Sequence, residues 1–124
     1  MSFSNILIVE DNPINALILE KTFDKEYNCF LAINDSETFA MLEETEFSLI
    51  LMDINLGRDS LDGVEIMKRI KAQDRFQDMK IFAVTSYAMP EDKKRFLSEG
   101  FDLYFSKPVE RDEIKKAVAE VFFS

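Results

Sequence analysis

Five polar side chains stand at or just beyond the ends of short apolar runs, and their types could do chemistry together if the fold brings them close. They are Glu10, Asp11, Asp53, Thr85 and Lys107. Three carboxylates a few ångströms apart repel by several kcal/mol per pair at an effective dielectric of about 20, so they require a compensating cation. Each residue alone has an ordinary explanation as a strand terminator, a helix cap or a solvated charge.

The apolar runs indicate the strands that must position these residues. The run Leu49-Ile50-Leu51-Met52-Asp53-Ile54-Asn55 is typical of a strand buried on both faces, because it lacks the alternation of a half-exposed strand. Further strands are predicted at 5–9, 27–33, 80–84 and 101–105. Glu10 and Asp11 follow the first of these strands, Thr85 follows the fourth, and Lys107 lies just beyond the fifth.

Helical patterns separate the strands. Helix starts are predicted at Asn12-Pro13, at Asn34, after Asp62-Gly63 and at Pro90, and a last helix is indicated by the apolar residues between Ile114 and Phe122. For the first helix we expect Ile14, Leu17, Ile18 and Phe23 to face inward.

Five strand and helix units in 124 residues predict one domain over residues 1–124, since a chain of this length has no room for a second. The fold class is α/β: a doubly wound, five-stranded parallel sheet of order 2-1-3-4-5 with helices on both faces, as in flavodoxin-like proteins. In such sheets ligands bind at the carboxyl ends of the strands, which is where the five polar residues are expected to gather.

Such a cluster suits a magnesium ion, which prefers carboxylate, carbonyl and phosphoryl oxygens; manganese could replace it. With a cation present Asp53 could attack phosphorus as a nucleophile. The Thr85 hydroxyl and the Lys107 ammonium could then each bind an oxygen of the transferred group. The sequence therefore predicts phosphoryl transfer centred on Asp53.

Composition excludes several other functions. A net charge of −9 argues against direct binding to nucleic acid. The chain has no histidine and a single cysteine, Cys29, so it cannot build an ordinary zinc site or a serine triad, and any phosphohistidine must come from a partner. We expect a cytoplasmic chain without membrane insertion, because no apolar stretch is long enough to span a bilayer and no secretory signal is evident.

The set Glu10-Asp11, Asp53, Thr85 and Lys107-Pro108, in this order and on these elements, closely resembles the receiver domain of two-component response regulators. The stretch Glu10-Asp11-Asn12-Pro13-Ile14-Asn15 is similar to the form common in receivers of hybrid kinases and phosphorelays. The resemblance covers nearly the whole chain.

The resemblance implies that Asp53 accepts a phosphoryl group from a histidine kinase or a histidine phosphotransfer protein. It further implies magnesium bound by Glu10, Asp11, Asp53 and the backbone carbonyl of Asn55. Thr85 and Tyr104 would act as the switch residues that alter a surface for a downstream protein target. It also implies a cis bond between Lys107 and Pro108.

One departure from the family and several alternatives remain open. The loop 56–61 is about two residues longer than usual, so we expect it to be more mobile. The chain could be a stand-alone regulator or a module excised from a hybrid histidine kinase that relays phosphoryl groups. A flavodoxin-like FMN-binding module, a phosphatase with an aspartyl nucleophile and a degenerate receiver are further alternatives. The acids after the first strand disfavour the flavin alternative, because they would repel its phosphate.

Overall fold

Five strands alternate with five α-helices in the computed structural model, which describes residues 4–123. The strands are β1 (Asn5–Val9), β2 (Asn28–Ala32), β3 (Leu49–Met52), β4 (Lys80–Thr85) and β5 (Leu103–Ser106). The helices are α1 (Pro13–Phe23), α2 (Asp35–Glu44), α3 (Gly63–Lys71), α4 (Pro90–Glu99) and α5 (Arg111–Phe123), with a short 3₁₀ turn, η1 (Asp74–Phe76), after α3.

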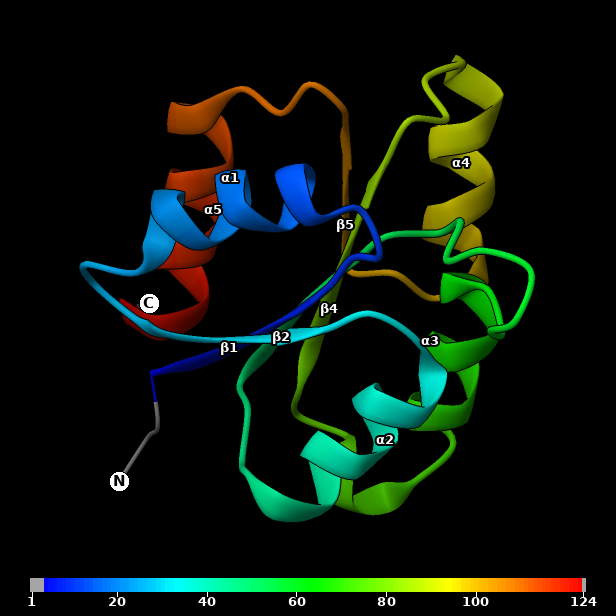
Figure 1. Ribbon diagram of the computed structural model, residues 1–124. Coiled ribbons are helices and arrows are strands. Elements are labelled where there is room, and N and C mark those ends of the chain that lie inside the picture. Colours follow the sequence, from blue (N-terminus) through cyan, green and yellow to red (C-terminus); the bar gives the residue numbers. More distant parts are fainter. Residues whose placement is uncertain (1–3, 124) are drawn as a thin grey trace.

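The strands form one parallel sheet in the order β2-β1-β3-β4-β5, which confirms the predicted topology. Helices α1 and α5 cover one face, and α2, α3 and α4 cover the other (Figure 1). Val9 of β1 lies opposite Met52 of β3. The next residues of the two strands, Glu10 and Asp53, therefore leave the sheet side by side.

The two central strands are buried along their whole length, as continuous apolar runs predict. Alternate side chains of β1 and β3 enter different cores, because successive residues of a strand point to opposite faces. Ile6 and Leu51 pack with α1 and α5, whereas Leu7 and Met52 pack with the helices of the other face. The rim that carries Glu10 and Asp53 is thus fixed from both sides.

Helix α1 packs on the sheet with a different side from the one that we predicted. Phe23 is buried as predicted, but Ile14, Leu17 and Ile18 are 68%, 50% and 59% exposed. The buried stripe consists of Ala16, Leu19 and Phe23. The prediction was wrong because α1 carries apolar residues on both sides, so that two stripes satisfy the helical spacing equally well.

Side-chain caps set the helix starts that the sequence indicated. The Asn12 side chain accepts hydrogen bonds from the backbone N–H groups of Ile14 and Asn15, both at 3.0 Å. The Asn34 side chain caps α2 and the Asp62 side chain caps α3 in the same way. Strand β5 begins two residues later than predicted, at Leu103, and η1 was not foreseen. Within residues 4–123 no helix is both long and apolar enough to cross a membrane.

Gly63, the first residue of α3, touches the strand end that carries Asp53. A Cβ atom added to Gly63 would lie 2.2 Å from the backbone oxygen of Asp53 and 2.9 Å from Cγ of Met52. The Gly63 N–H donates to the Ile54 carbonyl at 2.8 Å. Glycine is therefore required here by the close approach of two backbones.

We predict that Gly63→Ala lowers the free energy of unfolding by about 1 to 3 kcal/mol, because the new methyl group must displace backbone in a packed region. Chemical denaturation at equilibrium measures this loss. Glu65→Ala, at an exposed position one turn into the same helix, is the control and should change stability by less than about 0.5 kcal/mol. Equal stability of Gly63→Ala and wild type would contradict the close contact.

Candidate functional site

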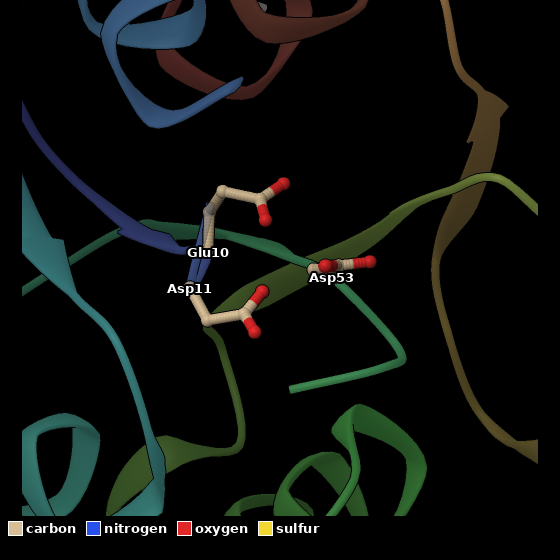
Figure 2. Close-up of side chains that lie close together, drawn as sticks. All are labelled: Glu10, Asp11 and Asp53. Carbon is tan, nitrogen blue, oxygen red and sulfur yellow. The ribbon is translucent and has the colours of Figure 1, made fainter. Parts of the chain in front are cut away.

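Three carboxylates meet beyond the ends of β1 and β3. Oxygen atoms of Glu10, Asp11 and Asp53 all lie within 4.8 Å of one another, and Figure 2 shows the three side chains grouped at this rim. Glu10 is 2% exposed and Asp53 is 7% exposed, whereas Asp11 faces solvent. The sheet order produces this grouping, because it makes β1 and β3 neighbours.

Among the described residues, Lys107 is the one whose ammonium group pairs with these carboxylates. Its Nζ lies 2.5 Å from Oε1 of Glu10 and 3.5 Å from Oδ2 of Asp53. The Lys107 backbone N–H donates to the Thr85 carbonyl at 2.8 Å, which extends the pairing of β4 with β5 to the rim. The bond from Lys107 to Pro108 is cis, as the resemblance implied.

Burial makes the Asp53 side chain a weaker acid than an exposed aspartic acid. Loss of water contact, followed by the charge of Glu10, raises the pKa of Asp53 to about 7, although Lys107 and the Ile54 N–H act in the opposite direction. The Ile54 N–H donates to Oδ1 of Asp53 at 2.8 Å. The second oxygen, Oδ2, faces Lys107. The cluster thus holds more negative charge than its one lysine neutralises, and this excess suits a divalent cation bound through oxygen.

The residues singled out from the sequence line a single cleft of about 380 Å³. Its lining consists of Glu10, Asp11, Asn12, Asn15, Asp53, Asn55, Thr85, Ser86, Tyr87 and Lys107. Thr85 is 1% exposed, and its hydroxyl oxygen accepts a hydrogen bond from the Tyr87 N–H at 3.3 Å. The structure therefore brings six of the seven predicted site residues together, and the seventh, Tyr104, lies outside the cleft.

Tyr104 of β5 is connected to the cleft through the loop after β4. Its hydroxyl donates to the backbone carbonyl of Tyr87, and its ring stacks on Phe96 with 6.1 Å between the centroids. Tyr87 itself lines the cleft two residues after Thr85. A movement of the loop after β4 would therefore displace the hydrogen-bond partner of the Tyr104 hydroxyl.

The long loop after β3 is anchored at two points, and its expected mobility stays a prediction. Leu56 is 5% exposed and belongs to the core beneath α2 and α3. At the other end, Asp35 of α2 accepts a hydrogen bond from the Leu61 N–H at 3.2 Å, and the Asp35 N–H donates to the Ser60 hydroxyl at 3.0 Å. The tip of the loop, Gly57, Arg58 and Asp59, is exposed.

Sequence reasoning did not place Asn12 or Asn15 among the site residues, and both line the cleft. The Asn12 N–H donates to Oε2 of Glu10 at 3.1 Å, which helps to orient that carboxylate. Asn15 lies one helical turn further along α1. The signal that could have found them is their spacing, since residues three apart at a helix start share a face.

Comparison with known proteins agrees with this geometry. The family model described as the response regulator receiver domain matches residues 6–119. The polar-differentiation response regulator DivK of Brucella anthropi is 33% identical over 106 residues, which cover 85% of this chain and 85% of that protein. Stress response regulator protein 1 of Debaryomyces hansenii is 35% identical over 108 residues. That match covers 85% of this chain but only 44% of the Debaryomyces hansenii protein, so the chain spans less than half of this relative.

One solved structure bears on the metal. The receiver domain of sensor histidine kinase PA1611 from Pseudomonas aeruginosa PAO1 is 29% identical, with a TM-score of 0.85, and the match covers 99% of this chain and 100% of that one. A magnesium ion is coordinated in its active site cleft. In this chain Glu10, Asp11 and Asp53 are the group of acids close enough together to hold a metal ion among residues 4–123.

The raised pKa of Asp53 predicts how stability depends on pH when divalent cations are removed by a chelator. The folded chain binds this proton more tightly than the unfolded chain, so Asp53 costs stability increasingly as the pH rises from about 4 to about 7. Asp53→Asn should therefore raise the free energy of unfolding by about 1 to 3 kcal/mol at about pH 8, and by almost nothing at about pH 4.

Equilibrium denaturation at the two pH values measures this difference. Asp59→Asn removes the same charge from the exposed loop tip and serves as the control, with no comparable gain expected at either pH. A gain for Asp53→Asn that is larger at the lower pH would show that the sign of the pKa shift is wrong.

Proposed function

This chain belongs to the response regulator receiver domain family, whose function is to accept a phosphoryl group, and we propose that its acceptor is Asp53. The observation that carries the proposal is the position of Asp53 in one cleft with two further carboxylates and Lys107. A flavin-binding module would need a glycine- or hydroxyl-rich loop after β1 to bind phosphate. This chain has two acids there, so the FMN alternative has no support.

Asp53, Lys107 and Thr85 each have a separate role in the proposed reaction. An oxygen of Asp53 forms the new bond to phosphorus as the bond from phosphorus to the donor nitrogen breaks. Lys107, 3.5 Å from Oδ2 of Asp53, neutralises charge on the phosphoryl oxygens. The Thr85 hydroxyl donates a hydrogen bond to another of these oxygens. A movement of Thr85 toward the phosphoryl group would shift Tyr87, whose N–H bonds to the Thr85 hydroxyl, and Tyr87 in turn accepts the hydrogen bond of the Tyr104 hydroxyl.

The family binds magnesium in this cleft, and the donor set of this chain fits it. We assign Glu10, Asp11 and Asp53 as carboxylate ligands and the Asn55 carbonyl as a fourth oxygen; manganese is an acceptable substitute. The ion would supply the positive charge that Lys107 alone does not provide, both for the cluster and for the transferred group.

The partners follow from the chemistry. The chain has no histidine, so a phosphohistidine donor must lie outside these 124 residues, and we propose a histidine kinase or a histidine phosphotransfer protein. Helix α1 reaches the cleft through Asn15, and its exposed Ile14, Leu17 and Ile18 support this helix as the surface that the donor protein contacts. A downstream protein target would read the face of α4, β5 and α5, where Tyr104 lies.

The range of the family match bears on the domain organisation. The family match from 6 to 119 supports our proposal that residues 1–124 form one receiver domain. Similarity to the receiver of a sensor histidine kinase also supports the second candidate, a phosphorelay module of a hybrid kinase. Both alternatives use the same acceptor chemistry.

We predict that the chain gains the mass of one phosphoryl group when it is incubated with magnesium and phosphoramidate, and that Asp53→Asn gains none. Intact mass spectrometry under non-hydrolysing conditions measures the gain. Asp59→Asn should be labelled like wild type, because Asp59 lies on the exposed tip of the loop. Labelling that persists in Asp53→Asn, or in the presence of excess chelator, would refute the proposed chemistry.

Magnesium should also stabilise the fold, because it binds only where the fold has assembled the three carboxylates. At a magnesium concentration of about 100 times its dissociation constant the gain is about 2.7 kcal/mol. We expect thermal melts to show this gain in wild type and in Asp59→Asn. Asp11→Asn removes one exposed carboxylate of the cluster and should lose most of it. An equal magnesium-induced rise in all three proteins would indicate binding elsewhere.

A further inference from the structure

Asn15 stands where the cleft meets a second cavity. This cavity, of about 280 Å³, lies between α1 and the start of α5, and its walls are mostly apolar, with Ile18, Val109 and Ile114 among them. Asn15 and Lys107 are the two residues that line both spaces. Lys107 already pairs with Glu10 and Asp53, so Asn15 is the uncharged polar group at this junction.

The Asn15 side chain is free to meet a ligand. Within residues 4–123 its amide has no hydrogen-bond partner, although its backbone N–H is held by Asn12 at 3.0 Å. The Asn12 side chain, by contrast, is occupied in capping α1. Asn15 is half-buried in the first turn of α1, where the Asn12 side chain accepts a hydrogen bond from its backbone N–H. A fixed amide without a partner beside a reacting centre is suited to bind part of a substrate.

The direction of attack decides which part of the donor reaches Asn15. In phosphoryl transfer the attacking and leaving atoms lie roughly in line on opposite sides of phosphorus. Asp53 is 7% exposed at the floor of the cleft, so the leaving group must point outward, toward the mouth. Because Asn15 lines both spaces, an aromatic leaving group at the mouth would turn its apolar carbons toward the second cavity and its polar edge toward Asn15.

We propose that the side-chain amide of Asn15 recognises the imidazole ring of the phosphohistidine donor and thereby favours ring-bearing donors over donors without a ring. This inference rests on Asp53 as the acceptor. One ring nitrogen carries the phosphoryl group and the other carries a proton, which the ring donates to the amide oxygen of Asn15. When the bond from phosphorus to nitrogen breaks, its electron pair stays on the ring nitrogen. The ring leaves as neutral imidazole and Asp53 holds the phosphoryl group.

Two small donors isolate this contact. Phosphoimidazole carries the ring, whereas phosphoramidate breaks the same type of bond and releases ammonia. With magnesium present, the rate constant of labelling is measured by intact mass for each donor, and the ratio of the two is compared between proteins. Loss of one hydrogen bond in Asn15→Ala should lower the rate with phosphoimidazole about fivefold and leave the rate with phosphoramidate within about twofold.

Two further variants test the source of the effect. Asn15→Asp keeps an acceptor oxygen and should retain most of the wild-type ratio, because any general effect of the added charge on phosphoryl binding cancels between the donors. Asp59→Asn changes a residue on the exposed loop tip that lines neither space, and it should keep the ratio unchanged. Thermal melts check that each variant is folded.

The outcomes separate this inference from the proposed function. A wild type labelled by both donors, with Asn15→Ala slowed equally for both or for neither, overturns the role of Asn15 and leaves Asp53 in place as the acceptor. A ratio that falls in Asn15→Asp as far as in Asn15→Ala also overturns it. A wild type that neither donor labels overturns the acceptor role of Asp53 and this inference with it.

Discussion

Two buried carboxylates share one ammonium group, and the chemistry of the cleft depends on this imbalance. Glu10 and Asp53 are almost excluded from water, and Lys107 lies 2.5 Å from the first and 3.5 Å from the second. A single cation cannot neutralise both acids, and Asp11 adds a third charge at the mouth. The remaining negative charge must be relieved by a proton on Asp53 or by a divalent cation. Of the two, only the divalent cation leaves Asp53 ionised, which is the state that the proposed attack on phosphorus requires.

The sheet maintains this arrangement because it prevents the carboxylates from moving apart. β1 and β3 pair in parallel and are buried throughout, and helices press on both of their faces. Gly63 allows α3 to touch the backbone of Asp53 directly. Repulsion between the acids is therefore opposed by the packing of two cores, and it cannot be relaxed by a small movement of one loop.

The sequence predicted the sheet and the residues at its rim well, because apolar runs that end in polar residues carry the information about both. It could not choose the inward face of α1, where Ile14, Leu17 and Ile18 satisfy the helical spacing as well as the buried Ala16, Leu19 and Phe23 do. Nor could it reveal contacts that depend on how separate elements pack. The hydrogen bonds of Asp35 to the long loop and the place of Asn15 between two cavities arise only from the folded backbone.

The ion pair between Lys107 and Glu10 joins residues that lie 97 positions apart in the sequence. A ribosome releases the acids of β1 and β3 long before it releases the lysine that follows β5. A growing chain therefore carries its acidic strand ends without their ammonium partner until synthesis has passed the last strand. A growing chain that ends before Lys107 cannot form the complete cleft, so the proposed acceptor site is assembled only after β5 has been synthesised.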